Sequence, residues 1–431
     1  MAEQTRVVII GCGFAGLTCA RKLEKLLPAE RAEIVVINRT NYMLFTPLLP
    51  EAAAGTLHPR HTGTPLRRVL KRAKVVVGET TDVDFENRTV TLIPPEGPDR
   101  VIHWDQLVIS PGSISRLFPI PGLAQYAYGF KTLPEAVHIR NHVLRMLEMA
   151  DVADDVAERH ARATFVVVGA GYAGTELIAE LQAMVSRVLD NYPRVRPHDV
   201  RWILVDVAPS VLPELGEGLG KRALQILRSR GIEIKLGTSV EEVGPDFCKL
   251  SDGEFISMKT FVWTAGVTPD PLIAKLGLPL EARGRLVCDR YTNVEGFDNV
   301  YALGDAAAIP DPAHPERATP PTAQFALRQA KTAARNIAAS LLDGQKKPFN
   351  FRGLGLLVNL ADRQGVAKLM GVPLSGFPAW AATQAYHLLA VPTVRRKIRV
   401  LADWTLAVGD KPDIAELGDL GRSGTLGNAD R

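Results

Sequence analysis

Two short glycine-rich segments have the residue types and spacing of a phosphate-binding turn. Residues 11–16 and 169–174 both read Gly-x-Gly-x-x-Gly, and each lies between an apolar run and a helix-like run. In such a turn the first glycine permits the bend, the second lets the main chain approach a pyrophosphate, and the third lets helix and strand pack closely. The helix N-terminus then offers free N–H groups to the phosphates. One such turn is weak support, because glycine turns follow many strands; two in the same context predict two dinucleotide-binding sites.

A polar side chain ends the strand that follows each turn. Asn38, with Arg39 after it, ends the first of these strands, and Asp206 ends the second. A carboxylate at this position can accept hydrogen bonds from ribose hydroxyls, and its charge repels a 2′-phosphate. Asp206 therefore predicts that the second site prefers NADH over NADPH, the alternative being an ordinary carboxylate at a strand end.

The two turns are expected at the same point of a repeated order of elements, which runs strand, turn, helix and strand. In chain order the expected segments are residues 6–10, 11–26 and 33–37 with a closing segment at 107–112, and residues 164–168, 169–189 and 202–205 with a closing segment at 261–266. This order is the βαβ unit of a parallel sheet, so the sequence predicts an α/β fold with two Rossmann-like domains.

Composition excludes several other classes of protein. The 431 residues have an ordinary globular balance of charged and apolar types, and the net charge of +4 does not point to nucleic acid. The four cysteines form no CxxC pair and no metal-ligand spacing, so we expect reduced thiols and no metal site. The N-terminus does not read as a signal peptide, and no apolar stretch is long enough to span a membrane.

Three further segments, together with the two turns, carry a family resemblance. Residues 303–305 read Leu-Gly-Asp after a short apolar strand, residues 41–55 read Asn-Tyr-Met-Leu-Phe-Thr-Pro-Leu-Leu-Pro-Glu-Ala-Ala-Ala-Gly, and residues 320–329 read Pro-Pro-Thr-Ala-Gln-Phe-Ala-Leu-Arg-Gln. From about Arg6 to about Leu406 the chain resembles flavoproteins with two dinucleotide-binding domains. Within them it is most similar to the type II NADH:quinone oxidoreductases, the single-chain respiratory NADH dehydrogenases that do not pump protons.

The resemblance implies a glutathione-reductase-like fold, FAD on the first domain, NADH on the second, and a quinone as electron acceptor. The residues matched to the FAD site are Gly11, Gly13, Phe14, Ala15, Gly16, Asn38, Arg39, Thr46, Pro47, Gly112, Gly304, Asp305, Ala323 and Gln324. Those matched to the NADH site are Gly169, Gly171, Tyr172, Ala173, Gly174, Glu176, Asp206, Ala265 and Gly266.

Two of these residues are matched to catalytic roles. Glu176 is expected beside the flavin, where it would shape the nicotinamide or quinone site and relay protons. Its alternative is an acid on the first turn of a helix, complementing the helix dipole. Gln324 would hydrogen-bond a quinone carbonyl, and without the resemblance it reads only as a polar residue at a helix start.

The chain also departs from its relatives. Asn38 stands where the family usually has an acid, and Arg328 stands where it usually has a glutamine. These changes concern FAD affinity and quinone specificity. No cysteine pair lies near the expected flavin position, which argues against a disulfide reductase. Cys248 and Cys288 do not match the pattern of sulfide:quinone oxidoreductases.

The C-terminal region has the pattern of a membrane-surface segment. Residues 378–390 read as one apolar helix, and Pro392 suits the first position of a second. On that second helix one face carries Val394, Ile398, Leu401, Trp404 and Val408, the other carries Arg395, Arg396, Arg399 and Asp403, and Lys397 lies at the edge. Such a helix is typical of an interfacial position, and its alternative is packing on the enzyme or in a dimer.

The predicted organisation is therefore an FAD domain, an NADH domain and a membrane-associating amphipathic helical region. The expected bounds are 1–115 with 290–350, 116–289, and 351–418, followed by a disordered tail at 419–431. We expect a peripheral protein on the cytoplasmic face of the cell membrane, with a homodimer possible. The alternatives are a soluble NAD(P)H-dependent reductase serving a protein such as ferredoxin, and a nucleotide-binding redox sensor with little turnover.

Overall fold

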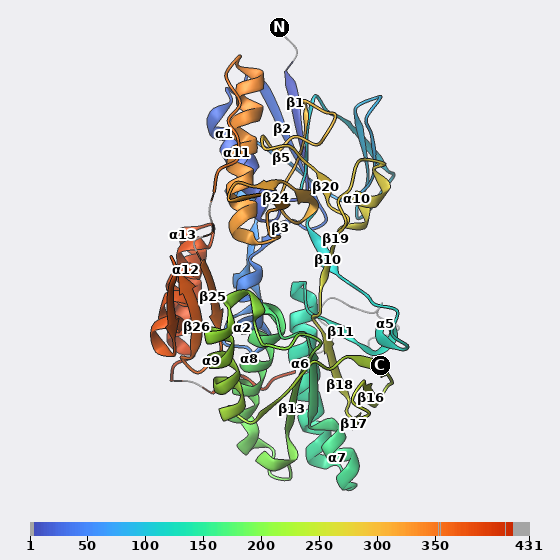
Figure 1. The fold of residues 1–431 in the computed structure, drawn as a ribbon, viewed down its shortest axis with the longest axis vertical. Coiled ribbons are helices and arrows are strands. Elements are labelled where there is room, and N and C mark those ends of the chain that lie inside the picture. Colours follow the sequence, from blue (N-terminus) through green and yellow to red (C-terminus); the bar gives the residue numbers. More distant parts are fainter. Residues whose placement is uncertain (1–3, 352, 354, 410, 417–431) are drawn as a thin grey trace. The chain divides into compact units, whose positions relative to one another are not determined.

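The computed structural model describes residues 4–351, 353, 355–409 and 411–416, so the predicted tail at 419–431 lies outside the described residues. The chain forms two compact units (Figure 1). Unit 1 takes the described residues within 1–45, 63–114 and 267–354. Unit 2 takes those within 46–62 and 115–266 and from 355 onwards.

Unit 1 is built around a five-stranded parallel sheet in the order β21-β9-β1-β2-β5. Its strands are β1 (Thr5–Ile10), β2 (Ala32–Asn38), β5 (Lys74–Val77), β9 (Gln106–Ile109) and β21 (Val300–Ala302). The middle of β1 is fully buried, as expected for a parallel strand covered on both faces.

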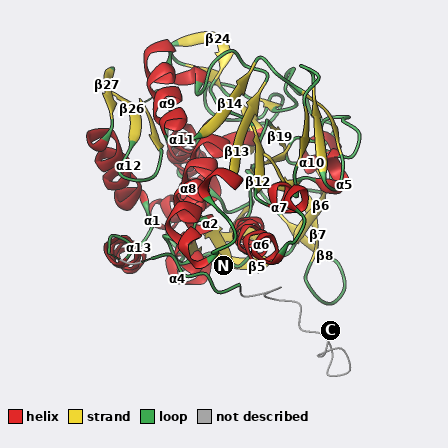
Figure 2. Cartoon of the chain, turned by 90° about the horizontal axis from the view of Figure 1, so that it is seen from below, coloured by secondary structure: helices red, strands yellow, loops and turns green. Residues whose placement is uncertain are grey.

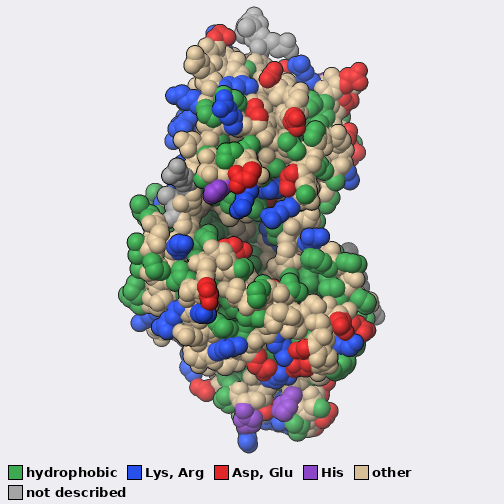
Figure 3. All heavy atoms as spheres, in the orientation of Figure 1, with side chains coloured by type: hydrophobic (Ala, Val, Ile, Leu, Met, Phe, Trp, Pro, Cys, Tyr) green, Lys and Arg blue, Asp and Glu red, His purple; other side chains and the backbone are tan. Residues whose placement is uncertain are grey.

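Helices and a small antiparallel sheet complete unit 1. Helices α1 (Phe14–Leu26) and α11 (Ala323–Leu341) pack side by side, and Lys and Arg side chains gather over this pair (Figures 1 and 3). Strands β6 (Glu79–Asp84), β7 (Thr89–Ile93) and β8 (Arg100–His103) form the antiparallel sheet, and α10 (Pro271–Lys275) contacts β6.

Unit 2 repeats the same sheet plan in the order β11-β18-β12-β13-β14. Its strands are β11 (Tyr128–Gly129), β12 (Thr164–Val168), β13 (Arg201–Asp206), β14 (Ile232–Leu236) and β18 (Thr260–Trp263), all paired in parallel. In both sheets the strand before the glycine turn lies between its βαβ partner and the closing strand. The α/β class and the repeat are thus confirmed.

The helices of unit 2 include α6 (Leu133–Val152), α8 (Tyr172–Val188) and α9 (Glu217–Ser229). The segment of residues 46–62 enters this unit as a short turn, Thr46–Leu48, followed by α2 (Leu49–Ala53) and α3 (Pro59–Thr62). Helix α2 packs against both α6 and α8 (Figure 2). Strands β15 (Val240–Val243), β16 (Phe247–Leu250) and β17 (Phe255–Ser257) form a separate antiparallel sheet.

The end of the chain adds a sheet that the sequence patterns did not indicate. Strands β25 (Gly355–Asn359), β26 (Gly365–Leu369) and β27 (Val372–Ser375) are antiparallel, and α12 (Phe377–Ala390) packs on them (Figure 1). Helix α13 (Val394–Leu406) follows. The prediction that Pro392 opens this helix is wrong: Thr393 is its N-cap, and the Thr393 side chain accepts from the Arg396 N–H at 3.3 Å.

The unit boundaries differ from the predicted domain boundaries at three places. The described residues from 355 onwards, predicted as a separate C-terminal region, belong to unit 2. Residues 267–289 belong to unit 1, because Leu272, Ile273 and Leu276 join its hydrophobic core. Residues 46–62 belong to unit 2, because α2 packs between α6 and α8. Hydrophobic periodicity predicts neither the assignment of residues 267–289 nor that of residues 46–62. Each segment follows the sequence of the other unit without a break in pattern.

Candidate dinucleotide and quinone site

The first glycine turn has the geometry of a pyrophosphate cradle. Gly11 has φ +82°, and a Cβ there would lie 2.2 Å from the Ser110 carbonyl oxygen. A Cβ at Gly16 would lie 1.9 Å from the Gly11 oxygen. At Gly13, in contrast, no described atom lies within 4 Å of an added Cβ. The protein itself therefore requires the first and third glycines, whereas the second leaves space for a ligand to approach the main chain.

The second turn repeats this geometry. Gly169 has φ +115°, a Cβ at Gly174 would lie 2.0 Å from the Gly169 oxygen, and a Cβ at Gly171 would meet no described atom within 4 Å. Gly13 and Gly171 are also the N-caps of α1 and α8. Because a glycine has no side chain with which to cap, the first N–H groups of both helices remain suited to phosphate oxygens. Phe14 and Ala15, like Tyr172 and Ala173, open these helices. The residues present fit a dinucleotide at each turn.

The two strand-end residues support their own glycine turns in the same way. In unit 1 the Asn38 Oδ1 accepts from the Cys12 N–H at 2.8 Å, and its amide nitrogen donates to the Thr40 oxygen at 2.8 Å. In unit 2 the Asp206 carboxylate accepts from the N–H of Ala170, and its other oxygen accepts from the Ala208 N–H at 2.7 Å. Both carboxylate oxygens of Asp206 retain lone pairs for further donors, such as ribose hydroxyls.

Arg39 is held within unit 1 by two acids. Its guanidinium lies 3.0 Å from Glu79 and 2.8 Å from the buried Asp270. Asp270 also caps α10 by accepting from the Leu272 N–H at 3.0 Å. The position of Arg39 beside the end of β2 is therefore fixed by the fold before any ligand binds.

The third marker, Gly304 and Asp305, lies in a single 3₁₀ turn after β21. The Asp305 carboxylate accepts from the Ser113 hydroxyl at 2.6 Å, next to Gly112. The Gly304 N–H donates to the side chain of Gln329 at 2.8 Å, and the Gln329 amide donates to the Thr319 hydroxyl at 2.9 Å. Sequence reasoning missed Gln329 as a support of this loop. Its position at the end of the 320–329 segment was the available signal.

Ala323 and Gln324 open α11, with Thr322 as the N-cap. Gln324 is half-buried on the first turn. The departure at Arg328 has a structural partner, since its guanidinium lies 5.1 Å from the ring centre of Phe351, a cation–π distance. This contact gives the arginine a packing role within unit 1.

Glu176 does not lie in the first turn of its helix. Helix α8 begins at Tyr172, so Glu176 is its fifth residue, and the first turn contains no acid. The alternative that Glu176 complements the helix dipole is therefore wrong. Its side chain is buried and accepts from the Asn359 N–H at 2.8 Å. Burial raises the pKa of Glu176 to about 8; the carboxylates of Glu51 and Glu180 act in the same direction and the Asn359 N–H acts against it.

The closing segment of unit 2 follows strand β18, and the 46–47 turn follows the short strand β3 (Tyr42–Leu44). The Thr264 hydroxyl donates to the Val168 oxygen at 2.7 Å, and Ala265 and Gly266 follow directly. Gly266 has φ +82°. Thr46 is exposed and Pro47 is half-buried.

The structure gathers most of the predicted residues into two groups. The first turn, Asn38, Arg39, Gly112, Gly304 and Asp305 surround the carboxyl ends of the unit 1 strands, and Gln324 belongs to the same unit. The second turn, Asp206, Ala265 and Gly266 surround the carboxyl ends of the unit 2 strands, and Glu176 and the 46–47 turn belong to that unit. Strand ends of this kind are where open α/β sheets bind ligands.

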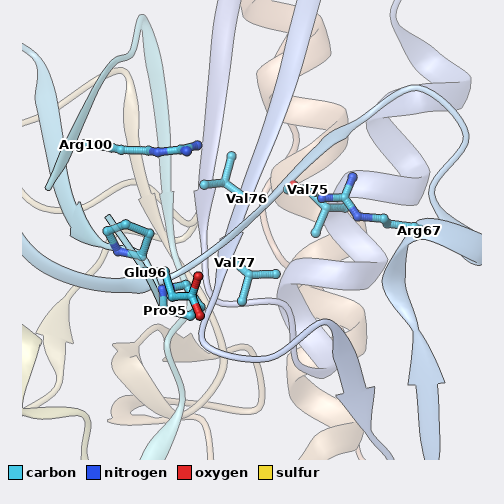
Figure 4. A pocket seen from close by; sticks show the side chains of 8 residues that line it. Arg67, Val75, Val76, Val77, Pro95, Glu96 and Arg100 are labelled. Atoms are coloured by element: carbon cyan, nitrogen blue, oxygen red, sulfur yellow. Dashed lines mark hydrogen bonds between the residues drawn. The ribbon is translucent and has the colours of Figure 1, made fainter. Parts of the chain in front are cut away.

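A pocket elsewhere on unit 1 contains none of these residues. It is lined by β5, β8 and the turn at residues 94–96, with Arg67 and Arg100 on opposite sides (Figure 4).

The four cysteines are not reactive thiols, although Cys12 lies within the first glycine turn. All four are buried, and burial raises the pKa of the Cys19 and Cys248 thiols to about 12, so neither is a thiolate at neutral pH.

Comparison with known proteins identifies the family. Residues 5–330 match the family of pyridine nucleotide-disulphide oxidoreductases. The chain is 32% identical over 420 residues to a type II NADH:quinone oxidoreductase of Mycobacterium tuberculosis, covering 93% of this chain and 87% of that protein. It is 30% identical over 410 residues to a probable NADH dehydrogenase of Dictyostelium discoideum, covering 93% and 89%.

A solved structure shares the fold over most of the chain. The structure of NDH2 from Plasmodium falciparum in complex with NADH superposes with a TM-score of 0.86 at 18% identity, covering 96% of this chain and all of that one. By sequence, the chain belongs to the pyridine nucleotide-disulphide oxidoreductases and, within them, to the type II NADH:quinone oxidoreductases.

Proposed function

We propose that this chain oxidises NADH and reduces a quinone, with FAD as the resident cofactor and without pumping protons. The observation that carries the proposal is the pair of glycine turns in which the second glycine, Gly13 or Gly171, faces open space at a helix N-terminus. Family membership supports the same reaction. When bound, FAD would accept a hydride from NADH and pass two electrons on to the quinone.

FAD is assigned to unit 1 and NADH to unit 2. In unit 1 the α1 N-terminus would hold the pyrophosphate, and Asp305, already fixed by Ser113, would hydrogen-bond the ribityl chain. In unit 2 the α8 N-terminus would hold the NADH pyrophosphate. Asp206 would accept from the adenosine ribose hydroxyls, and its negative charge would disfavour the 2′-phosphate of NADPH.

Glu176 and Gln324 are assigned to the quinone half of the reaction. Reduction of a quinone takes up two electrons and two protons, so a nearby group must supply a proton at neutral pH. A buried carboxyl with its pKa raised to about 8 is protonated under these conditions and can donate. Gln324, half-buried at the start of α11, has an amide that can donate to a quinone oxygen as charge develops on it.

Helix α13 supports attachment to a membrane surface through its exposed apolar side chains. Val394, Ile398 and Leu401 are 71%, 63% and 51% exposed, although solvent-facing positions of a helix are normally polar. On the opposite side, Val400 is buried against the protein and Asp403 pairs with His61. Hydrophobic side chains also reach the surface over α12 and the β25–β27 sheet (Figure 3).

Two residues of the predicted apolar face lie elsewhere. Val408 follows Leu406, the last residue of α13, and so is not part of the helix. The Trp404 indole N–H donates to the buried Glu51, so Trp404 is turned toward the protein and away from the exposed side chains. Within the described residues, no helix has the length and apolar character required to cross a bilayer. We infer a peripheral position for the chain, on the cytoplasmic face of the cell membrane, reached through α12 and α13.

An acceptor screen on the purified, FAD-loaded protein tests this function. With NADH as donor, a water-soluble quinone analogue should sustain multiple turnovers, and a ferredoxin should not. Turnover with ferredoxin alone would point to a soluble reductase. Binding of both nucleotides without turnover on any acceptor would point to a redox sensor. Either result would overturn the proposal.

A further inference from the structure

Three buried carboxyl groups lie together in unit 2, and only one of them has an assigned role. Glu176 and Glu180 are four residues apart and share one face of α8, and Glu51 comes from α2, which packs on α8. The side chains of Glu51, Glu176 and Glu180 are 4%, 9% and 5% exposed. Burial raises the pKa of all three, to about 8 for Glu176 and for Glu180, and repulsion from neighbouring carboxylates acts in the same direction on these two.

Asn359, the last residue of β25, connects the three carboxyl groups. Its main-chain N–H donates to Glu176 at 2.8 Å, and its side-chain amide donates to Glu180 at 2.9 Å and to Glu51 at 3.2 Å. The oxygen of the same side-chain amide, Oδ1, accepts from the Ala361 N–H at 2.9 Å. This last bond fixes the orientation of the amide, so that the nitrogen faces the carboxyl groups.

The remaining partners differentiate the three groups. Glu51 also accepts from Gln384 on α12 at 3.0 Å and from Trp404 on α13, both neutral donors. Glu180 is the group that cations stabilise: Arg230 and Arg187 favour its carboxylate, and Asp362, which pairs with both arginines, opposes them. The Asn359 N–H favours the carboxylate of Glu176, Glu51 and Glu180 disfavour it, and the phenol of Tyr172 on α8 lies nearby.

The three carboxyl groups do not ionise with equal ease. The arginines favour the charge on Glu180, and three neutral donors, Asn359, Gln384 and Trp404, favour the charge on Glu51, against the burial that raises the pKa of both. Glu176 receives one main-chain N–H and the repulsion of both neighbours. We propose that Glu180 and Glu51, linked through the Asn359 amide, are positioning residues for quinone reduction: the first negative charge of the cluster falls on them, and its repulsion keeps the proton on Glu176, from which it is donated. This inference rests on the proposed role of Glu176 as the proton donor.

Isosteric substitutions separate charge from packing. Glu180→Gln and Glu51→Gln each remove one of the two sites for the repelling charge, so the pKa of Glu176 should fall, by about one pH unit for a like charge at this range in a buried site. Asn359→Ala should act in the same direction. It keeps the main-chain N–H to Glu176 but removes the donor that stabilises the other two carboxylates. Glu217→Gln, on the exposed surface of α9 in the same unit, is the matched control.

The test has two readouts on the FAD-loaded protein. Infrared spectroscopy with isotope-labelled glutamate follows the protonated carboxyl band against pH, and the band that disappears in Glu176→Gln reports Glu176 itself. Stopped-flow measurement of quinone-driven reoxidation against pH gives the kinetic midpoint. Both midpoints should move to lower pH in the three cluster variants and stay in place in Glu217→Gln. Unchanged or raised midpoints in the variants that fold would overturn the inference.

The same measurements distinguish failure of this inference from failure of the proposed role of Glu176. If Glu176→Gln leaves quinone reoxidation unaffected, the role of Glu176 as proton donor fails, even if the infrared midpoint still moves. If Glu176→Gln slows reoxidation but neither midpoint moves in the cluster variants, the role of Glu176 survives and that of Glu180, Glu51 and Asn359 fails.

Discussion

The carboxylate of Asp206 accepts a hydrogen bond from the main-chain N–H of Ala170, inside the glycine turn of unit 2. The residue expected to bind the ribose thus also supports the turn expected to bind the pyrophosphate. In unit 1 a side-chain amide supports the turn in the same way, since the Asn38 Oδ1 accepts from the Cys12 N–H at the equivalent position. An amide at this place is therefore compatible with a formed turn.

The comparison between Asn38 and Asp206 gives a sharp test of nucleotide preference. Asp206→Asn should keep the acceptor for Ala170 but remove the charge that repels a 2′-phosphate. The ratio of kcat/KM for NADH over NADPH should fall by about tenfold, or about 1.4 kcal/mol. Asp206→Ala should instead weaken both donors, because the turn loses its support. An unchanged ratio in Asp206→Asn would contradict the assignment.

The second glycine of each turn should matter for binding and not for folding. Gly171 has extended main-chain angles and open space around its Cβ direction, so Gly171→Ala should leave the melting temperature of the protein without NADH nearly unchanged. NADH binding, measured by calorimetry, should weaken because the added methyl group occupies the pyrophosphate position. Gly174→Ala is the contrast. Its Cβ would lie 2.0 Å from the Gly169 oxygen, so folding itself should suffer. Equal NADH affinity in Gly171→Ala and the unaltered protein would exclude a pyrophosphate at this turn.

The raised pKa of Glu176 also predicts how stability depends on pH. Below pH 4.5 the carboxyl is protonated whether the chain is folded or not. Between pH 4.5 and about 8 the unfolded chain ionises it while the folded protein keeps the proton, so the group's contribution to stability is lost as pH rises through this window. Glu176→Gln should therefore gain free energy of unfolding relative to the unaltered protein, by at most about 1.4 kcal/mol per pH unit. Denaturant titrations across the window measure it, and a difference that does not grow with pH would contradict the pKa.

The two half-reactions should respond differently to the catalytic residues. Glu176→Gln and Gln324→Ala should both retain FAD, because neither residue belongs to a glycine turn or a strand end. Flavin reduction by NADH depends mainly on geometry and should slow only mildly. Reoxidation by quinone needs a proton and a hydrogen bond, so it should fall by about tenfold or more. Rapid mixing resolves the two steps. A loss confined to the reductive step would move Glu176 to the nicotinamide site.

Membrane attachment is best tested by surface substitutions on α13. Truncating the chain before α12 would also remove Gln384 and Trp404, and with them two donors to the buried Glu51, so it would confuse attachment with folding. Replacing Val394, Ile398 and Leu401 together by serine removes exposed apolar side chains, each worth on the order of 1 kcal/mol in a membrane surface. Vesicle binding should weaken by at least about tenfold.

Two outcomes of this experiment would contradict membrane attachment through α13. Val152→Ser and Val207→Ser alter equally exposed apolar residues of unit 2 outside α12 and α13, and should leave vesicle binding unchanged. If they weaken it as much as the α13 substitutions do, the helix has no special role. If the α13 variant instead changes the oligomeric state in solution and not vesicle binding, the face covers a second copy of the chain.

The sequence alone determined the elements whose signal is local. Each glycine turn lies between an apolar strand and a helix within about thirty residues, and the chemistry of the first and third glycines is a matter of adjacent main chain. Asp206 and Asn38 could be placed for the same reason, because they end the strand that pairs with the one before the turn. The apolar face of α13 was likewise visible from helical periodicity.

Tertiary structure alone decided the environment of Glu176. Its three-carboxyl cluster joins α2, α8, β25, α12 and α13, and Asn359 lies 183 positions further along the chain than the Glu176 it contacts. No periodicity relates such segments, and a glutamate on a helix reads the same whether it meets water or two other buried carboxyl groups. Tertiary structure also decided the orientation of Trp404. Its side chain points away from the apolar face of α13, because the buried carboxyl group of Glu51 on another segment accepts from its indole N–H.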